Sequence, residues 1–222
     1  QVADMTRRQQ GVWSILGGVA LLGVWWIFSR RLGSDLVLPS PELVARRLAT
    51  LIATRPFWLA VAGSLWRVLV ALLVSIPLAV LCGLATASSP RSRAFLSPAF
   101  AVISATPVLS VILIAVLVFG QEGTPVFSAF LMLFPVMATA VNEGVASIDL
   151  RLREMTAIYH LSRAQRFWHL YVPSLAPFLA SGLRTSLSLA WKVVVAAEVI
   201  AQPLRSLGAS MQNAKAQLET AE

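Results

Sequence analysis

The segment that decides the fold is SIDLRLREMTAIYHLSRAQRFWHLYVP, residues 147–173, which is charged and lies between two long apolar runs. Apolar side chains recur in its first half at intervals of three and four residues, and this spacing predicts a short amphipathic helix that starts near Asp149. The apolar residues are Leu152, Met155, Ile158 and Tyr159. Such a helix needs a partner for its apolar side.

The second half of the segment predicts a second short helix. Ser162 and Gln165 have the spacing of a capping box, so this helix is expected to begin at Arg163 and to end at Pro173. A turn at residues 160–161 would join the two helices. Two short helices held outside a bilayer favour a docking surface for a large partner over a small-molecule pocket.

The composition of the whole chain is that of a membrane protein. Of the 222 residues, 57% are hydrophobic and only 13% are charged, and the mean hydropathy is +0.76. A net charge of +8 would suggest nucleic acid in a soluble protein, but here the arginines flank apolar spans, as lipid anchors do, so no nucleic-acid partner is expected. The single cysteine, Cys82, and the two histidines form no metal-ligand set in the sequence, so no metal site is expected either.

Hydropathy predicts an all-α bundle of about five membrane-spanning helices in one domain that covers residues 1–222. The third span contains prolines and is expected to break near Thr106 and Pro107, and a tight turn at residues 121–123 should lead into the fourth. The expected spans are residues 11–28, 60–87, 94–119, 124–142 and 174–201.

Prolines elsewhere in the chain refine this layout. Ser40, Pro41 and Glu42 predict the start of an amphipathic helix that lies along the membrane surface. Pro173 and Pro177 suit the first turn of the fifth span, because a proline there removes no internal hydrogen bond. Basic residues outside the spans divide almost equally between the two sides, so charge does not set the orientation.

Residues 147–173 resemble the cytoplasmic EAA loop of the membrane-spanning subunits of ATP-binding-cassette importers. Glu154 and the two residues after it stand at the Glu-Ala-Ala positions, and Pro173 stands at the proline that ends the motif, 19 residues on (173 minus 154). His160 occupies the position of the family's glycine, the residue that tolerates positive φ freely. The stretches LPSPELVARRL, SATPVLSVILIAVLVFG and SGLRTSLSLAWKVVVAAEVI extend the similarity, towards the nitrate, sulfonate and taurine branch.

The resemblance implies a type I importer permease: a subunit for ATP-driven, binding-protein-dependent uptake of a small anionic or vitamin-like solute across the bacterial inner membrane. Implied partners are two ATPase subunits, a second copy of the permease, a periplasmic or lipid-anchored binding protein, and membrane lipid. The N-terminus and the loop would be cytoplasmic. No cofactor is expected on this chain, since it lacks a glycine-rich phosphate loop and the partner ATPases would bind ATP and Mg. The chain itself would not be an enzyme.

The resemblance assigns ATPase coupling to the loop. The expected coupling residues are Arg153, Glu154, Met155, Ile158, Tyr159, His160, Ser162, Arg163 and Pro173.

A polar stripe on the fifth span suggests a translocation pathway. Ser181, Arg184, Thr185, Ser188 and Lys192 fall within an arc of about 100°, and Glu198 would extend the stripe. Charges in a span must face protein or water. An internal ion pair of Lys192 with Glu198 or Glu143 is the alternative to a pathway role. The expected pathway residues are Thr106, Pro107, Ser181, Arg184, Ser188, Lys192 and Glu198.

Two other classes of function compete with the importer. An ion-driven secondary transporter would need an intramembrane acid, for which Glu198 is the candidate. A membrane enzyme would need a catalytic cluster at one membrane depth, and the sequence offers none. Residues 206–222 lead into a sixth membrane helix in the permeases that this chain resembles, and the chain begins with Gln1, so the sequence is expected to be part of a longer protein.

Overall fold

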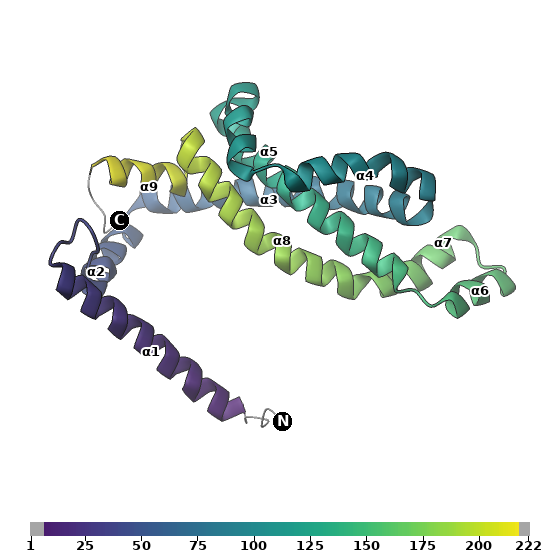
Figure 1. Ribbon diagram of the computed structural model, residues 1–222, viewed down its shortest axis with the longest axis horizontal. Coiled ribbons are helices and arrows are strands. Elements are labelled where there is room, and N and C mark those ends of the chain that lie inside the picture. The colour runs from purple at the N-terminus through teal and green to yellow at the C-terminus, as the bar shows by residue number, and fades with distance from the viewer. Residues whose placement is uncertain (1–6, 218–222) are drawn as a thin grey trace. The chain divides into compact units, whose positions relative to one another are not determined.

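The computed structural model describes residues 7–217, apart from the side chains of Arg7, Arg8, Gln10, Arg153, Ala157 and Arg163. Every regular element in this range is helical, so the fold is an all-α membrane helix bundle (Figure 1). The elements are α1 Arg7–Leu32, α2 Pro41–Ile52, α3 Arg55–Ser88, α4 Pro90–Ala105, α5 Val108–Ala146, α6 Leu150–Ile158, α7 Arg163–Arg166, a π-turn Phe167–Tyr171, α8 Val172–Ala201 and α9 Leu207–Ala216.

The chain divides into two compact units, the first comprising Gln1–Trp58 and Ser210–Glu222 and the second Leu59–Ala209. In the first unit, the hydroxyl of Ser40 caps α2 by accepting a hydrogen bond from the backbone N–H of Leu43 (3.3 Å), so the predicted helix start is confirmed.

Two indoles from the end of α1 fasten the start of α2 in this first unit. Trp25 donates to the carbonyl of Pro39 (3.2 Å) and Trp26 donates to the carboxylate of Glu42 (2.9 Å). A hydrogen bond from its own backbone N–H, followed by the bond from Trp26, lowers the pKa of Glu42 below its ordinary value.

The second unit is organised by α3, α5 and α8, which lie side by side (Figure 1). Small residues let these helices approach closely. A Cβ on Gly83 would stand 2.7 Å from Val141, one on Gly144 would stand 2.6 Å from Leu175, and one on Gly182 would stand 2.8 Å from Ala140. The shared core consists of Val68, Ala71, Leu72, Ala129, Leu133, Ala190, Val193 and Val194.

The predicted break at Thr106 and Pro107 is confirmed. Thr106 is extended (φ −75°, ψ 127°) and ends α4, while Pro107 precedes α5. The predicted third span, residues 94–119, is therefore divided between α4 and the first part of α5, because Pro107 has no N–H to continue the helix and its ring disfavours helical backbone in Thr106.

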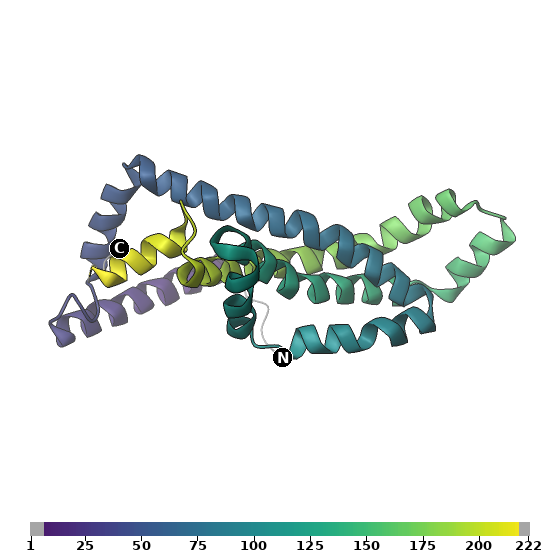
Figure 2. The same cartoon turned by 90° about the horizontal axis from the view of Figure 1, so that it is seen from above.

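The predicted turn at residues 121–123 lies slightly earlier, at Gly120. This glycine has φ 66° and ψ −173°, a conformation that only glycine adopts without strain. The rings of Phe119 and Phe127 stack across the break with centroids 4.3 Å apart. Figure 2 shows the result, a short and a long part of α5 that run in different directions.

Three of the described helices are long and apolar enough to cross a membrane, over Gly11–Leu32, Arg55–Ser88 and Val108–Ala146. Helix α8 has 30 residues, or about 45 Å of helix, but it carries Arg184, Lys192 and Glu198. The count of five spans stays a prediction.

Candidate functional site

Residues 147–173, which we call the docking segment, begin as expected. The carboxylate of Asp149 accepts a hydrogen bond from the backbone N–H of Arg151 (2.9 Å), and α6 starts at Leu150. Its apolar side chains are exposed: Met155 by 48%, Ile158 by 72% and Tyr159 by 71%. Helix α6 therefore presents an apolar surface outward in the part of the chain that the structure describes.

The turn after α6 is a Schellman motif centred on His160. This residue has φ 49°, in the left-handed region, and the N–H of Leu161 donates to the carbonyl of Thr156 (3.1 Å), which is the bond that defines the motif. His160 thus adopts the positive φ that a glycine at the family's position would adopt more easily.

The predicted capping box at the next helix is confirmed. The N–H of Gln165 donates to the hydroxyl of Ser162 (3.3 Å), and the N–H of Ser162 donates to the side-chain oxygen of Gln165 (2.9 Å). Helix α7 accordingly begins at Arg163. The side chains of Arg153 and Arg163, two of the expected coupling residues, lie outside the described part, whereas Glu154 is exposed.

The prediction that Pro173 ends this helix is wrong. The chain passes from α7 through the π-turn Phe167–Tyr171 directly into α8, and the N–H of Val172 donates to the carbonyl of Phe167. Pro173 has no N–H, so the ordinary α-helical bond at this point cannot form, and the wider turn absorbs the gap. Pro177 lies beyond the first turn of α8. The docking segment is thus continuous with α8.

The polar stripe predicted on α8 lies on one exposed side of the helix. All five residues of the stripe are exposed: Ser181, Arg184, Thr185, Ser188 and Lys192. The opposite side contributes Gly182, Ser186 and Ala190 to the interior of the second unit. No described side chain forms an ion pair with Lys192, so the alternative pair with Glu198 or Glu143 is not formed in this subunit.

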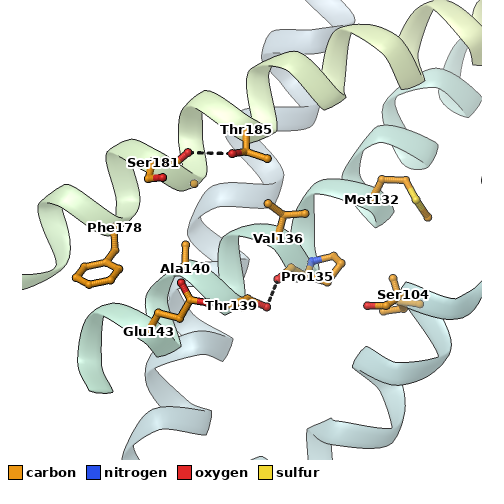
Figure 3. A pocket seen from close by; sticks show the side chains of 12 residues that line it. Ser104, Met132, Pro135, Val136, Thr139, Ala140, Glu143, Phe178, Ser181 and Thr185 are labelled. Carbon is orange, nitrogen blue, oxygen red and sulfur yellow. Dashed lines mark hydrogen bonds between the residues drawn. The ribbon is translucent and has the colours of Figure 1, made fainter. Parts of the chain in front are cut away.

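Two residues of the stripe line a cavity of about 520 Å³ between α4, α5 and α8 (Figure 3). Ser181 and Thr185 face Thr139 and Glu143 of α5 across it, with Ser104 of α4 on the third side. Both threonine hydroxyls donate to backbone carbonyls of their own helices, which leaves hydroxyl lone pairs free to accept from a solute or water.

A second cavity of about 590 Å³ continues the first along α5 and α4. The two cavities share Ser104, Pro135, Thr139 and Glu143. The second adds Arg93, whose Nε donates to the carbonyl of Thr86 (3.3 Å). The sequence analysis did not connect Thr139 and Arg93 with this site; the signal available was a group of polar residues, Thr139, Asn142 and Glu143, at the end of an otherwise apolar span.

Glu198 is not on the exposed stripe, and this corrects the predicted placement. It is fully buried and forms an ion pair with Arg67 of α3 (3.2 Å). The hydroxyl of Ser64 donates to the other carboxylate oxygen (2.7 Å). A buried carboxylate on the inner side of α8 needs a partner of opposite charge, and Arg67 supplies it. Thr106 and Pro107 lie at the break between α4 and α5 and line neither cavity.

Comparison with known proteins places the sequence among membrane transport components. Residues 75–220 match the family described as "Binding-protein-dependent transport system inner membrane component". The taurine transport system permease protein TauC of Escherichia coli is 33% identical over 202 residues, covering 87% of this chain and 73% of that protein. The putative aliphatic sulfonates transport permease protein SsuC of Escherichia coli is 31% identical over 206 residues, covering 91% and 77%.

A third relative is the nitrate import permease protein NrtB of Synechocystis, which is 28% identical over 191 residues, covering 81% of this chain and 68% of that protein. The helical fold and the apolar spans define a polytopic membrane protein. The chain belongs to the family of binding-protein-dependent transport system inner membrane components. Its relatives are transport permeases rather than enzymes.

Proposed function

We propose that this chain is the membrane-spanning subunit of an ATP-driven importer. A separate ATPase would bind the docking segment on the cytoplasmic side, and ATP and Mg would be held by that subunit. Two copies of the chain would form the pathway, and a solute-binding protein would deliver the solute from the other side of the bacterial inner membrane. The N-terminus would then be cytoplasmic.

The observation that carries the proposal is the outward apolar surface of α6. Exposing Ile158 by 72% and Tyr159 by 71% to water is unfavourable in a free cytoplasmic helix, and covering them would recover about 1.5–3 kcal/mol for each fully buried side chain. The Schellman turn at His160 and the capping box at Ser162 fix the helix ends, so the surface is presented in one geometry.

For the solute we propose a small anion of the sulfonate or nitrate type. The exposed stripe on α8 carries Arg184 and Lys192, and a cation on a pathway wall favours an anionic solute. The relatives named for taurine, aliphatic sulfonates and nitrate support this class. The stripe and the cavity beside Ser181 would together form one wall of the pathway, facing the second copy.

The competing function is an ion-driven secondary transporter. Such a protein needs an intramembrane acid that can bind and release the driving ion. Glu198 was the candidate, but Arg67, Ser64 and the backbone N–H of Gly208 all engage its carboxylate. No other observation favours this function, so we retain the importer.

The experiment is purification of the chain with its partners, wild type beside Ile158→Arg. An arginine on the apolar surface of α6 should leave the membrane bundle intact while the ATPase no longer co-purifies. Leu36→Arg is the matched control, because it also places an arginine at an exposed apolar residue (58%) but outside the docking segment, and it should retain the ATPase. Normal ATPase stoichiometry in Ile158→Arg would overturn the proposed docking surface.

A further inference from the structure

We propose that the loop between α8 and α9, residues 202–206, is a preorganised contact site for the solute-binding protein, and that Arg67 is the residue that positions it. This inference rests on the proposed function, since it names where one partner of the importer binds. It follows from a buried network of charged and backbone groups that the transport pathway does not use.

The loop lies at the opposite end of α8 from the docking segment (Figure 1). Between Val172 and Glu198 the helix rises about 39 Å, at 1.5 Å per residue, which exceeds a hydrocarbon layer of about 30 Å. With α8 as the expected fifth span, a docking segment on one face of the membrane places the α8–α9 loop at the other face, where a solute-binding protein would arrive.

The guanidinium group of Arg67 forms four hydrogen bonds, two to backbone carbonyls of the loop and two to carboxylates beside it. Its Nη2 contacts the carboxylate of Glu122 (2.6 Å) and donates to the carbonyl of Leu204 (2.9 Å). Its Nη1 contacts the carboxylate of Glu198 (3.2 Å) and donates to the carbonyl of Arg205 (3.4 Å). The planar fork of arginine suits such a double pairing, whereas a lysine offers only a point charge.

The two carboxylates hold the loop from its other side. Glu122 accepts a hydrogen bond from the backbone N–H of Leu204 (2.8 Å), and Glu198 accepts one from the N–H of Gly208 (3.1 Å). The hydroxyl of Ser64 accepts from the N–H of Leu207 (3.0 Å). Backbone groups at 204, 205, 207 and 208 are therefore all bonded to side chains of α3, α5 and α8.

Close packing adds to this restraint. A Cβ on Gly63 of α3 would collide with the carbonyl of Arg205, and a Cβ on Gly208 would collide with Glu198. Gln202 (φ 51°) and Arg205 (φ 52°) both adopt left-handed backbone, which is unfavourable for residues other than glycine and persists only where the surroundings impose it. The loop is thus held in one strained conformation rather than left to relax.

The held loop presents a definite surface. The side chain of Leu204 is 80% exposed at its tip, although both of its backbone groups are bonded, and Arg205 beside it is exposed as well. Trp66 and the outer side of Glu122 border a cavity of about 510 Å³ next to this tip. A protein surface with an apolar pocket and a nearby acidic residue fits this arrangement, and a rigid tip lowers the entropy lost on binding.

The first test measures ATPase stimulation of the purified complex by solute-loaded binding protein. Leu204→Ala and Arg205→Glu should raise the binding-protein concentration for half-maximal stimulation by about 5–30-fold, the range expected for an interface anchor, with basal ATPase and maximal rate unchanged. Leu117→Ala, which alters another highly exposed leucine (87%), is the matched control and should leave that concentration unchanged.

The second test separates positioning from contact. Glu122→Ala removes the acceptor for the N–H of Leu204, so we expect faster hydrogen exchange at Leu204 and a similar rise in half-maximal concentration, although Leu204 itself is intact. Because the buried guanidinium of Arg67 keeps its ion pair with Glu198 in this variant, we expect only a modest loss of thermal stability. A purely structural role would change stability and leave the half-maximal concentration as it is.

Failure of the proposed loop contact and failure of the proposed importer function would give different results. If the complex contains an ATPase that the binding protein stimulates, but Leu204→Ala and Arg205→Glu leave the half-maximal concentration unchanged, the loop is not the contact site and Leu204 merely faces lipid or water. If no ATPase co-purifies with the wild-type chain, the importer function fails, and this inference fails with it. Should Arg205→Glu fail to assemble, Leu204→Ala alone decides between these results.

Discussion

At the scale of single residues, His160 shows how position can outweigh preference. A histidine at φ 49° is strained, and glycine would hold the same backbone without strain. The Schellman bond from Leu161 to Thr156 and the capping box after it impose the turn from both sides. His160 therefore holds the turn between α6 and α7 although the glycine of the resembling family is absent.

This argument predicts opposite behaviour for two substitutions of His160. His160→Gly should preserve ATPase binding and change the stability of the complex by less than about 1 kcal/mol, because relief of strain offsets the greater freedom of glycine in the unfolded chain. His160→Val should destabilise the turn by about 1–2 kcal/mol, since a β-branched residue is poorly tolerated at positive φ. Thermal unfolding of the purified complex measures both, and equal stability of the two variants would contradict the account.

At the scale of elements, the sequence predicts a helix end correctly where one residue type determines the local backbone conformation. Ser40, Ser162 with Gln165, and the pair Thr106 and Pro107 each set a helix end where the structure has one. The sequence does not indicate the π-turn before α8: Pro173 predicts a helix end, whereas the wider turn absorbs its missing N–H and the chain stays helical.

These local signals do not predict contacts between residues that are far apart in the sequence. Arg67 and Glu198 are 131 positions apart, and neither their spacing nor their neighbours indicates that α3 and α8 meet there. Periodicity placed Glu198 near the polar stripe, but a rotation of about 40° was enough to turn it inward to Arg67. The polar stripe itself was predicted because it depends on one helix alone.

At this scale, the close packing of α5 against α8 predicts that a larger residue at position 182 lowers stability. Gly182→Leu should destabilise the second unit by about 1–3 kcal/mol, because a side chain there would collide with Ala140 and crowd Met137. Ala180→Leu is the matched control, since position 180 is exposed on the same helix and should accept leucine with little effect. Thermal unfolding in detergent compares them. Equal stability of the two variants would show that the close approach at Gly182 is not required.

At the scale of the whole molecule, α8 is the element that links the proposed sites. It continues from the docking segment through the π-turn, carries the polar stripe and ends at the loop held by Arg67. A displacement of the docking segment would therefore be transmitted along one continuous helix to the wall of the pathway. This linkage would couple ATP hydrolysis in a partner to exposure of the stripe.

The stripe predicts a defined effect of charge removal. Lys192→Met keeps the length of the side chain but removes its charge, so uptake of an anionic solute into vesicles with the ATPase and binding protein present should fall about tenfold or more. Assembly should be normal because Lys192 is exposed in the subunit. Lys215→Met, at an exposed lysine of α9, is the control. Unchanged uptake and solute preference would exclude Lys192 from the pathway.

Site-specific cross-linking can show whether α6 binds the ATPase. Cys82, the only cysteine, is replaced by serine, and a single cysteine is placed at Ile158 or, as a control, at exposed Leu36 outside the docking segment. The account predicts that Ile158→Cys cross-links to a co-purified ATPase in an active complex and that Leu36→Cys does not. An active complex in which Ile158→Cys gives no cross-link to the ATPase, or in which Leu36→Cys cross-links equally well, would contradict it.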